Sequence, residues 1–276
     1  MIRNAKIIIV LACAFVLPQE GPGKWAFKLS VTEAVAVNRG LGHMVRNQVK
    51  TVGVISLANS FGEGFVKALE TAAPQKGVRI TTVEKYHATD QSVTAQALKV
   101  LATNPDAVYI FSSGTAGALP HIVLVNRGYK GKIYQTQGVA NNDFLRVGGA
   151  AVEGGFITIA PVMVVEQLPD AHPSKKASLD FLRKWDARHG AATRNLFSAT
   201  AWDALLLLEA GTKEALKKAK PGTPEFRTAL RDALEGVRNL AGTTAVYDMS
   251  PQDHNGVDER SQELARIEKG TWKHIP

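Results

Sequence analysis

The sequence predicts an α/β fold with parallel sheets flanked by helices, and a second domain joined to the first by more than one crossing of the chain. A strand, a helix and a second strand follow one another within residues 106–136, and such a β–α–β unit requires a parallel sheet. After residue 160 the pattern changes, because three helices follow without strands between them and strands return only near the end. A chain of 276 residues can supply two lobes with a hydrophobic core each.

The β–α–β unit is the most informative stretch. Residues 106–112 form a short run of apolar, β-branched and aromatic side chains, which is typical of a buried strand. Residues 116–126 carry apolar side chains near helical spacing and end at Arg127 and Gly128, a helix stop. Residues 132–136 form the next strand.

Ligands of open α/β sheets bind beyond the carboxyl ends of the strands. Here these ends are residues 112–115 and 136–138, which are small, polar and contain glycine. Their hydroxyl, amide and backbone N–H groups could bind a small polar ligand. The alternative is that both are ordinary turns with good capping residues.

The N-terminal apolar run, residues 7–17, has two interpretations. Arg3 and Lys6 precede it, as in an export signal, and residues 12–14 could be a small-residue cleavage site. A buried parallel strand also has a continuous run of Ile, Val and Leu. We favour the strand, because only six apolar residues precede that site. A lipid-modified Cys13 is a third interpretation.

The remaining elements follow from apolar periodicity, helix caps and glycine or proline stops. We expect further strands at residues 25–29, 51–57, 78–86, 154–160, 243–249 and 263–269, the last with Trp272. We expect helices at residues 32–49, from within 58–64 to about 75, 92–102, 143–147, 174–189, 197–220 and 223–237. Residues 161–173 contain prolines, and an irregular hinge is expected there.

Composition and motifs exclude several classes of function. The net charge of +8 is spread along the chain, and the one dense basic run, residues 217–220, ends a predicted helix, so no nucleic-acid partner is expected. No apolar run reaches the about 18 residues of a membrane span. The single cysteine excludes an internal disulfide.

Motifs for cofactors, metals and catalysis are absent from the sequence. There is no phosphate loop, no complete dinucleotide fingerprint and no zinc spacing. Ser112 and Ser113 do not lie in a nucleophile elbow, and no acid is placed to orient His121. We therefore expect no cofactor and a binding protein rather than an enzyme, with a serine–histidine hydrolase as the alternative.

A set of short motifs runs through most of the chain. They are NSFGEG at 59–64, TDQSVTAQ at 89–96, NPDAV at 104–108, RGYKG at 127–131, QGVANNDF at 137–144, PGTPEF at 221–226, DHNGVD at 253–258 and GTWK at 270–273. In these motifs the chain resembles the periplasmic solute-binding proteins of branched-chain amino acid type ABC transporters, the leucine/isoleucine/valine-binding family of type I periplasmic-binding fold.

The resemblance implies two α/β lobes joined by three crossings, with a small ligand clamped between them and no catalysis. The first lobe would comprise residues 1–29 and 161–239, and the second residues 30–160 and 240–276. The first lobe is expected to be incomplete, because the family has roughly three more β–α units of about 30 residues at its start. The chain would then be a fragment or have a misassigned start.

The resemblance also implies polar site residues. Gln137 stands where the family's amino acid receptors have a glutamate that pairs with the ligand's ammonium group. A neutral amide there costs about 1–3 kcal/mol of binding to a zwitterion and suits a ligand without an ammonium group. Ser113 takes another pocket position, and Thr115 lies in the same turn.

Apolar site residues follow in the same way. Phe61 stands at a family tyrosine position and would form a pocket wall, with Phe197 on the apolar side from the first lobe. Plain core packing is the alternative for both. Cys13 lies where the family has small and hydroxylic residues, so this half of the site is expected to be degraded.

These implications predict the substrate-binding component of an ABC transporter in the periplasm. It would bind a branched-chain or hydrophobic amino acid, or an aromatic or aliphatic carboxylate, in the cleft between the lobes and deliver it to a membrane permease. The alternatives are a ligand-sensing regulatory domain of the same fold, or a truncated remnant with impaired binding.

Overall fold

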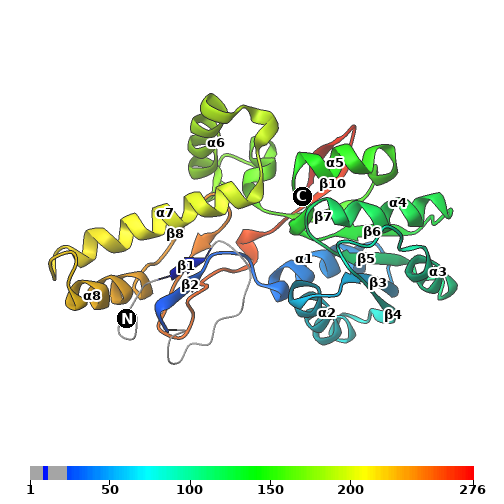
Figure 1. Cartoon of the computed structure of the whole chain (residues 1–276), viewed down its shortest axis with the longest axis horizontal. Helices are drawn as coiled ribbons and strands as arrows, with labels where there is room; N and C mark the ends of the chain where they lie inside the picture. The colour runs from blue at the N-terminus through cyan, green and yellow to red at the C-terminus, as the bar shows by residue number, and fades with distance from the viewer. Residues whose placement is uncertain (1–8, 12–23) are drawn as a thin grey trace.

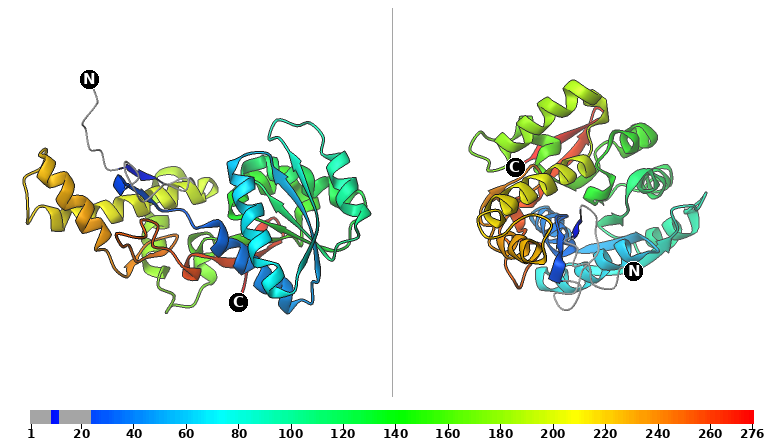
Figure 2. Two further views of the ribbon diagram at one scale, coloured as in Figure 1. Left: turned by 90° about the horizontal axis from the view of Figure 1, so that it is seen from below. Right: turned by 60° about the vertical axis from the view of Figure 1, so that its left-hand side comes forward.

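The computed structural model describes residues 9–11 and 24–276. Its elements fall into two groups along the long axis of the molecule (Figure 1). One group is a seven-stranded sheet with its helices, and the other contains three long helices and short strands. The left view of Figure 2 shows the same separation from below.

The large sheet is mainly parallel. Its strands, from one edge to the other, are β11 (Thr271–Ile275), β10 (Glu263–Glu268), β7 (Phe156–Ile159), β6 (Lys132–Gln135), β5 (Ala107–Phe111), β3 (Thr51–Leu57) and β4 (Arg79–Tyr86). The strands from β4 to β7 pair in parallel, and β10 pairs antiparallel with β7 and β11. The carboxyl ends of β3, β5 and β6 therefore meet at one edge of the sheet.

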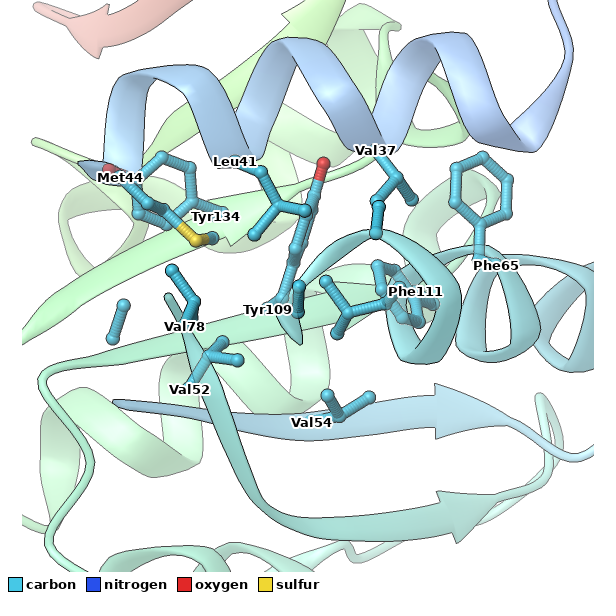
Figure 3. Close-up of a cluster of buried hydrophobic side chains, with 14 of the residues drawn as sticks. Val37, Leu41, Met44, Val52, Val54, Phe65, Val78, Tyr109, Phe111 and Tyr134 are labelled. Carbon is cyan, nitrogen blue, oxygen red and sulfur yellow. The ribbon is translucent and has the colours of Figure 1, made fainter. Parts of the chain in front are cut away.

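Helices cover both faces of this sheet, and β5 shows why. Tyr109 and Phe111 pack against α1 (Glu33–Arg46) and α2 (Ser60–Ala72), as Figure 3 shows. Val108 and Ile110 point to the other face, in the cluster of α3 (Thr94–Ala102) and α4 (Ala118–Asn126). Because successive side chains of a strand alternate between faces, an all-apolar strand needs cover on both sides. Near β7, α5 (Asn142–Gly148) adds Phe144 and Leu145 to a third cluster.

The second group is built on three helices, α6 (Lys175–His189), α7 (Leu196–Ala215) and α8 (Pro224–Glu235). The short strands β8 (Leu240–Ala241) and β9 (Val246–Tyr247) pair antiparallel, and β1 (Ile9–Leu11) pairs in parallel with β2 (Ala26–Lys28). Phe27 and Leu29 share one apolar cluster with Leu207, Leu234 and Tyr247. This cluster joins segments from both ends of the chain.

Two expectations from the sequence change. Residues 161–173 are not irregular throughout, because the 3₁₀ helix η6 spans Pro161–Gln167. The strand expected at residues 243–249 shrinks to two residues, since the chain turns between β8 and β9. Ala245, Tyr247 and Met249 pack with residues of α7 and α8.

The N-terminal apolar run forms a strand over Ile9–Leu11, which agrees with the interpretation we favoured for those residues. The rest of the run, including Cys13, lies outside the described residues.

Candidate ligand-binding cavity

A cavity of about 280 Å³ lies between the two groups of elements. From the sheet it is lined by Asn59, Ser60, Phe61, Ser113, Gln137 and Gly138, which follow β3, β5 and β6. From the other group it is lined by Leu196, Phe197, Thr200, Thr244 and Ala245. Segments that run between the groups add Leu29, Ser30, Val31, Ala160, Ser261 and Gln262.

In the turn after β5, Ser113 lines the cavity and Ser112 does not. Ser112 is fully buried, and its Oγ accepts a hydrogen bond of 2.7 Å from the Tyr86 hydroxyl. Burial raises the pKa of Tyr86 to about 12, so this hydroxyl stays protonated and donates. The Ser112 carbonyl accepts from Thr136 Oγ1 at 2.7 Å. These bonds tie the turns after β5 and β6 together, and Ser113 is the serine left to line the cavity.

Gly138 allows the two turns to approach each other. A Cβ at this position would lie 2.6 Å from the Ser112 carbonyl oxygen and 3.0 Å from Ser113 Cβ. Only glycine fits so close a backbone approach. The neighbouring Gln137 is 7% exposed, and its Oε1 has no hydrogen-bond partner within the described part of the chain. The structure thus places Ser113 and Gln137 in the lining of one cavity.

Two further lining residues resemble Gln137 in having a buried polar atom without a hydrogen-bond partner. Ser30 Oγ and Gln262 Oε1 are buried and have no partner among residues 9–11 and 24–276. Gln262 is held in place by its amide nitrogen, which donates to the Ser261 carbonyl at 2.7 Å. A buried polar atom without a partner is costly, at about 1–3 kcal/mol. Three such atoms belong to residues that line one cavity.

Two helices begin at the cavity. Asn59 caps α2 by accepting from the Gly62 N–H at 3.0 Å, and Asn195 caps α7 by accepting from the Ser198 N–H at 2.9 Å. The residues just after these caps line the cavity. The first N–H groups of a helix lack intrahelical partners and carry the positive end of the helix dipole. This end of each helix favours a negatively charged group.

The remaining walls are apolar, and two aromatic side chains form part of them. Phe61 packs on Phe65 with ring centroids 4.8 Å apart. Phe197 is 49% exposed, although it lies in the first turn of α7. No side chain of Asp, Glu, Lys, Arg or His is among the described residues that line the cavity. The site therefore combines apolar walls with uncharged polar groups.

One expected site residue, Thr115, does not line the cavity. Thr115 is exposed in the 3₁₀ helix η3 (Gly114–Gly117), because Gly114 takes a φ of +60° and redirects the chain after Ser113. Cys13 lies outside the described residues.

Other lining residues were missed by the sequence analysis. Ser30 and Gln262 lie on segments that run between the groups, Thr200 lies in α7, and Thr244 lies between β8 and β9. No local motif distinguishes them, since they become neighbours only through the tertiary fold.

Within residues 9–11 and 24–276, no group of three or more His, Cys, Asp or Glu side chains could hold a metal ion. In the same ranges, no helix is both long and apolar enough to cross a bilayer.

Comparison with known proteins places this geometry in context. A family profile described as "Periplasmic binding protein" matches residues 1–270. An extracellular ligand-binding receptor from Rhodopseudomonas palustris is 36% identical, with a TM-score of 0.92, and the match covers 98% of this chain and 75% of that one. Rp1789 of R. palustris strain CGA009 is 37% identical, with a TM-score of 0.89 and coverage of 93% and 72%.

A more distant structure shares the fold. It is an ABC transporter solute-binding protein of R. palustris in complex with benzoate, 18% identical, with a TM-score of 0.71 and coverage of 91% and 65%. No curated protein matches the chain.

Proposed function

The chain belongs to the periplasmic binding protein family, and from this premise we propose that it is the solute-binding component of an ABC transporter. Members of the family are receptors that bind small molecules without converting them. On this proposal the protein works in the periplasm and delivers its ligand to a membrane permease. The two groups of elements are its lobes, and the ligand binds in the cavity between them.

The observation that carries the proposal is the composition of the cavity. Apolar walls enclose about 280 Å³, and Ser30, Gln137 and Gln262 contribute buried polar atoms without partners. Ligand sites of proteins are mostly apolar with a few polar groups that fix orientation. A small molecule with an apolar body and a polar end fits this arrangement.

We propose that the ligand is an aromatic or aliphatic carboxylate without an ammonium group. Gln137 is neutral, and no carboxylate lines the cavity within the described chain, so an ammonium group would be desolvated without a counter-charge. A carboxylate could instead use the N-terminal ends of α2 and α7 and the Ser113 hydroxyl. This favours such carboxylates over branched-chain amino acids as ligands.

A thermal-shift assay with benzoate, phenylacetate, hexanoate and leucine tests the proposal. A ligand at one hundred times its dissociation constant stabilises the folded state by about 2.7 kcal/mol. We expect an increase in melting temperature with at least one carboxylate and a smaller one with leucine.

Two variants locate the binding. Phe197→Ala should lose the shift, whereas Thr115→Ala, an exposed residue beside the cavity, should keep it. Folded protein that shifts with none of the four compounds would count against the proposal.

A further inference from the structure

Asp203 is a fully buried carboxylate in α7, and its partners come from one short segment. It accepts hydrogen bonds from the N–H groups of Thr243 at 2.6 Å and Thr244 at 2.8 Å, and from the Thr244 hydroxyl at 2.7 Å. The Tyr247 hydroxyl lies 3.0 Å from its Oδ2. One side chain thus binds the turn between β8 and β9 and the strand that follows it.

The partners of Asp203 belong to the cavity wall. Thr244 and the next residue, Ala245, line the cavity, although Asp203 itself does not. The Tyr247 hydroxyl also lies 3.4 Å from the carbonyl oxygen of Leu29, another lining residue. The helix that carries Asp203 contributes its first residues to the same cavity. Asp203 therefore connects three separate stretches of the lining.

Apolar packing and two further hydrogen bonds also hold this segment on the helices. Ser178 Oγ donates to the Thr243 carbonyl, and Thr243 Oγ1 donates to the Ala199 carbonyl, each at 3.0 Å. Tyr247 and Met249 pack with Leu207 of α7 and Leu234 of α8. Such packing is non-directional, so it attaches the segment without defining where the backbone of the turn lies. Hydrogen bonds depend on both distance and angle, and Asp203 accepts four of those that fix this position.

We propose that Asp203 is a positioning residue for ligand binding, which holds the turn at Thr243 and Thr244 in place as a wall of the cavity. This role rests on the proposed function. A carboxylate suits it because both oxygens only accept hydrogen bonds. In Asp203→Asn the amide nitrogen replaces one acceptor, so a donor would face an N–H group of the turn and the turn must shift.

Asp106 provides a control away from the cavity. Its Oδ2 accepts from the N–H groups of Lys50 and Thr51 at 2.8 Å each, and from the Thr51 hydroxyl at 2.9 Å. The donor types include those at Asp203, but all three reach one oxygen of an exposed side chain. Asp106 directly precedes β5, at the end of the strand remote from the cavity. In Asp106→Asn the amide oxygen can keep all three bonds, so this variant removes an aspartate charge without moving the backbone.

The experiment is calorimetric titration of benzoate, phenylacetate, hexanoate and leucine into wild type, Asp203→Asn, Tyr247→Phe and Asp106→Asn, with the melting temperature of each protein. We expect Asp203→Asn to weaken the tightest-binding compound by about tenfold or more. Tyr247→Phe should weaken it less, because only the hydroxyl beside Leu29 is lost. Asp106→Asn, which can keep its hydrogen bonds, should leave the dissociation constant within about twofold.

An unchanged dissociation constant in Asp203→Asn, with a lowered melting temperature, would overturn the positioning role and leave the proposed function intact. If Asp203→Asn does not fold, the same criterion applies to Tyr247→Phe. An unchanged dissociation constant with a lowered melting temperature in that variant would then overturn the positioning role. If wild type binds none of the four compounds, the proposed function fails and the positioning role fails with it.

Discussion

At the scale of single residues, Gln137 is the side chain that should decide ligand class. Gln137→Glu places a carboxylate in a cavity that has no charged side chain among its described lining residues. A carboxylate ligand would then meet a like charge, whereas the ammonium group of leucine would gain a charge-assisted hydrogen bond worth about 1.5–3 kcal/mol. We expect the variant to bind leucine more tightly and benzoate more weakly than wild type in calorimetric titrations. If the affinities for leucine and benzoate both rise or both fall, Gln137 has no role in selectivity.

Two buried histidines should make stability depend on pH. Burial, with smaller contributions from Arg46, Lys132 and Arg39, lowers the pKa of His43 to about 4. Burial also lowers the pKa of His121 to about 4. Both rings are neutral in the folded protein at pH values where the unfolded chain, with a histidine pKa of about 6.5, binds protons.

The free energy of unfolding should therefore be highest above about pH 6.5 and fall as the pH drops toward about 4, by up to about 1.4 kcal/mol per pH unit for each histidine. Urea unfolding between pH 7 and 4.5 measures this slope. His43→Gln should reduce it, since one of the groups that bind protons only in the unfolded chain is removed. If the unfolding free energy of His43→Gln depends on pH as steeply as that of wild type, His43 does not contribute to the pH dependence.

Two of the predicted residues that reach the cavity lie next to a strand end, and the sequence pattern itself places them together. Ser113 and Gln137 follow predicted parallel strands, so the sheet brings them to one edge. Ser30 and Gln262 are 232 positions apart in sequence, and only the packing of the whole chain makes them neighbours. Local pattern carries no information about such pairs.

At the scale of elements, two glycines of α1 should respond in opposite directions. A Cβ at Gly40 would lie 2.5 Å from the hydroxyl oxygen of the fully buried Tyr109. At Gly42 the nearest atom is the flexible Arg46 Nη1, at 3.7 Å. We expect Gly42→Ala to raise the free energy of unfolding by about 0.5–1 kcal/mol, because alanine favours the helix. Gly40→Ala should lower it by about 1–3 kcal/mol through overpacking.

Chemical denaturation of the two variants beside wild type gives both values. A Gly40→Ala protein as stable as Gly42→Ala would show that the contact between α1 and β5 is looser than the structure indicates.

Elements with strong periodic patterns were predictable from sequence, and those defined by tertiary contacts were not. The strand–helix–strand unit that begins at residue 106 forms as β5, α4 and β6, because its apolar runs and glycine stops are local signals. The strand expected at residues 243–249 is cut short at its start. There the backbone turns to bind Asp203, a residue some 40 positions earlier.

At the scale of the whole molecule, the α/β class and the mainly parallel sheet agree with the expectation from sequence. The extent of each lobe depends on which core a returning segment joins. Residues 245–249 join the cluster of α7 and α8, whereas β10 and β11 join the large sheet. Both segments are short, apolar and strand-like in sequence, so their periodicity does not distinguish the two destinations. We propose that the lobe boundary lies between them.

The most direct test of the account is a crystal structure of the protein with the compound that binds tightest among benzoate, phenylacetate, hexanoate and leucine. We predict density for the compound between the two groups of elements, in contact with both Gln137 and Phe197. Density only elsewhere, for example in the groove of α1 and α2 beside His254, would contradict the account, as would the absence of any bound compound.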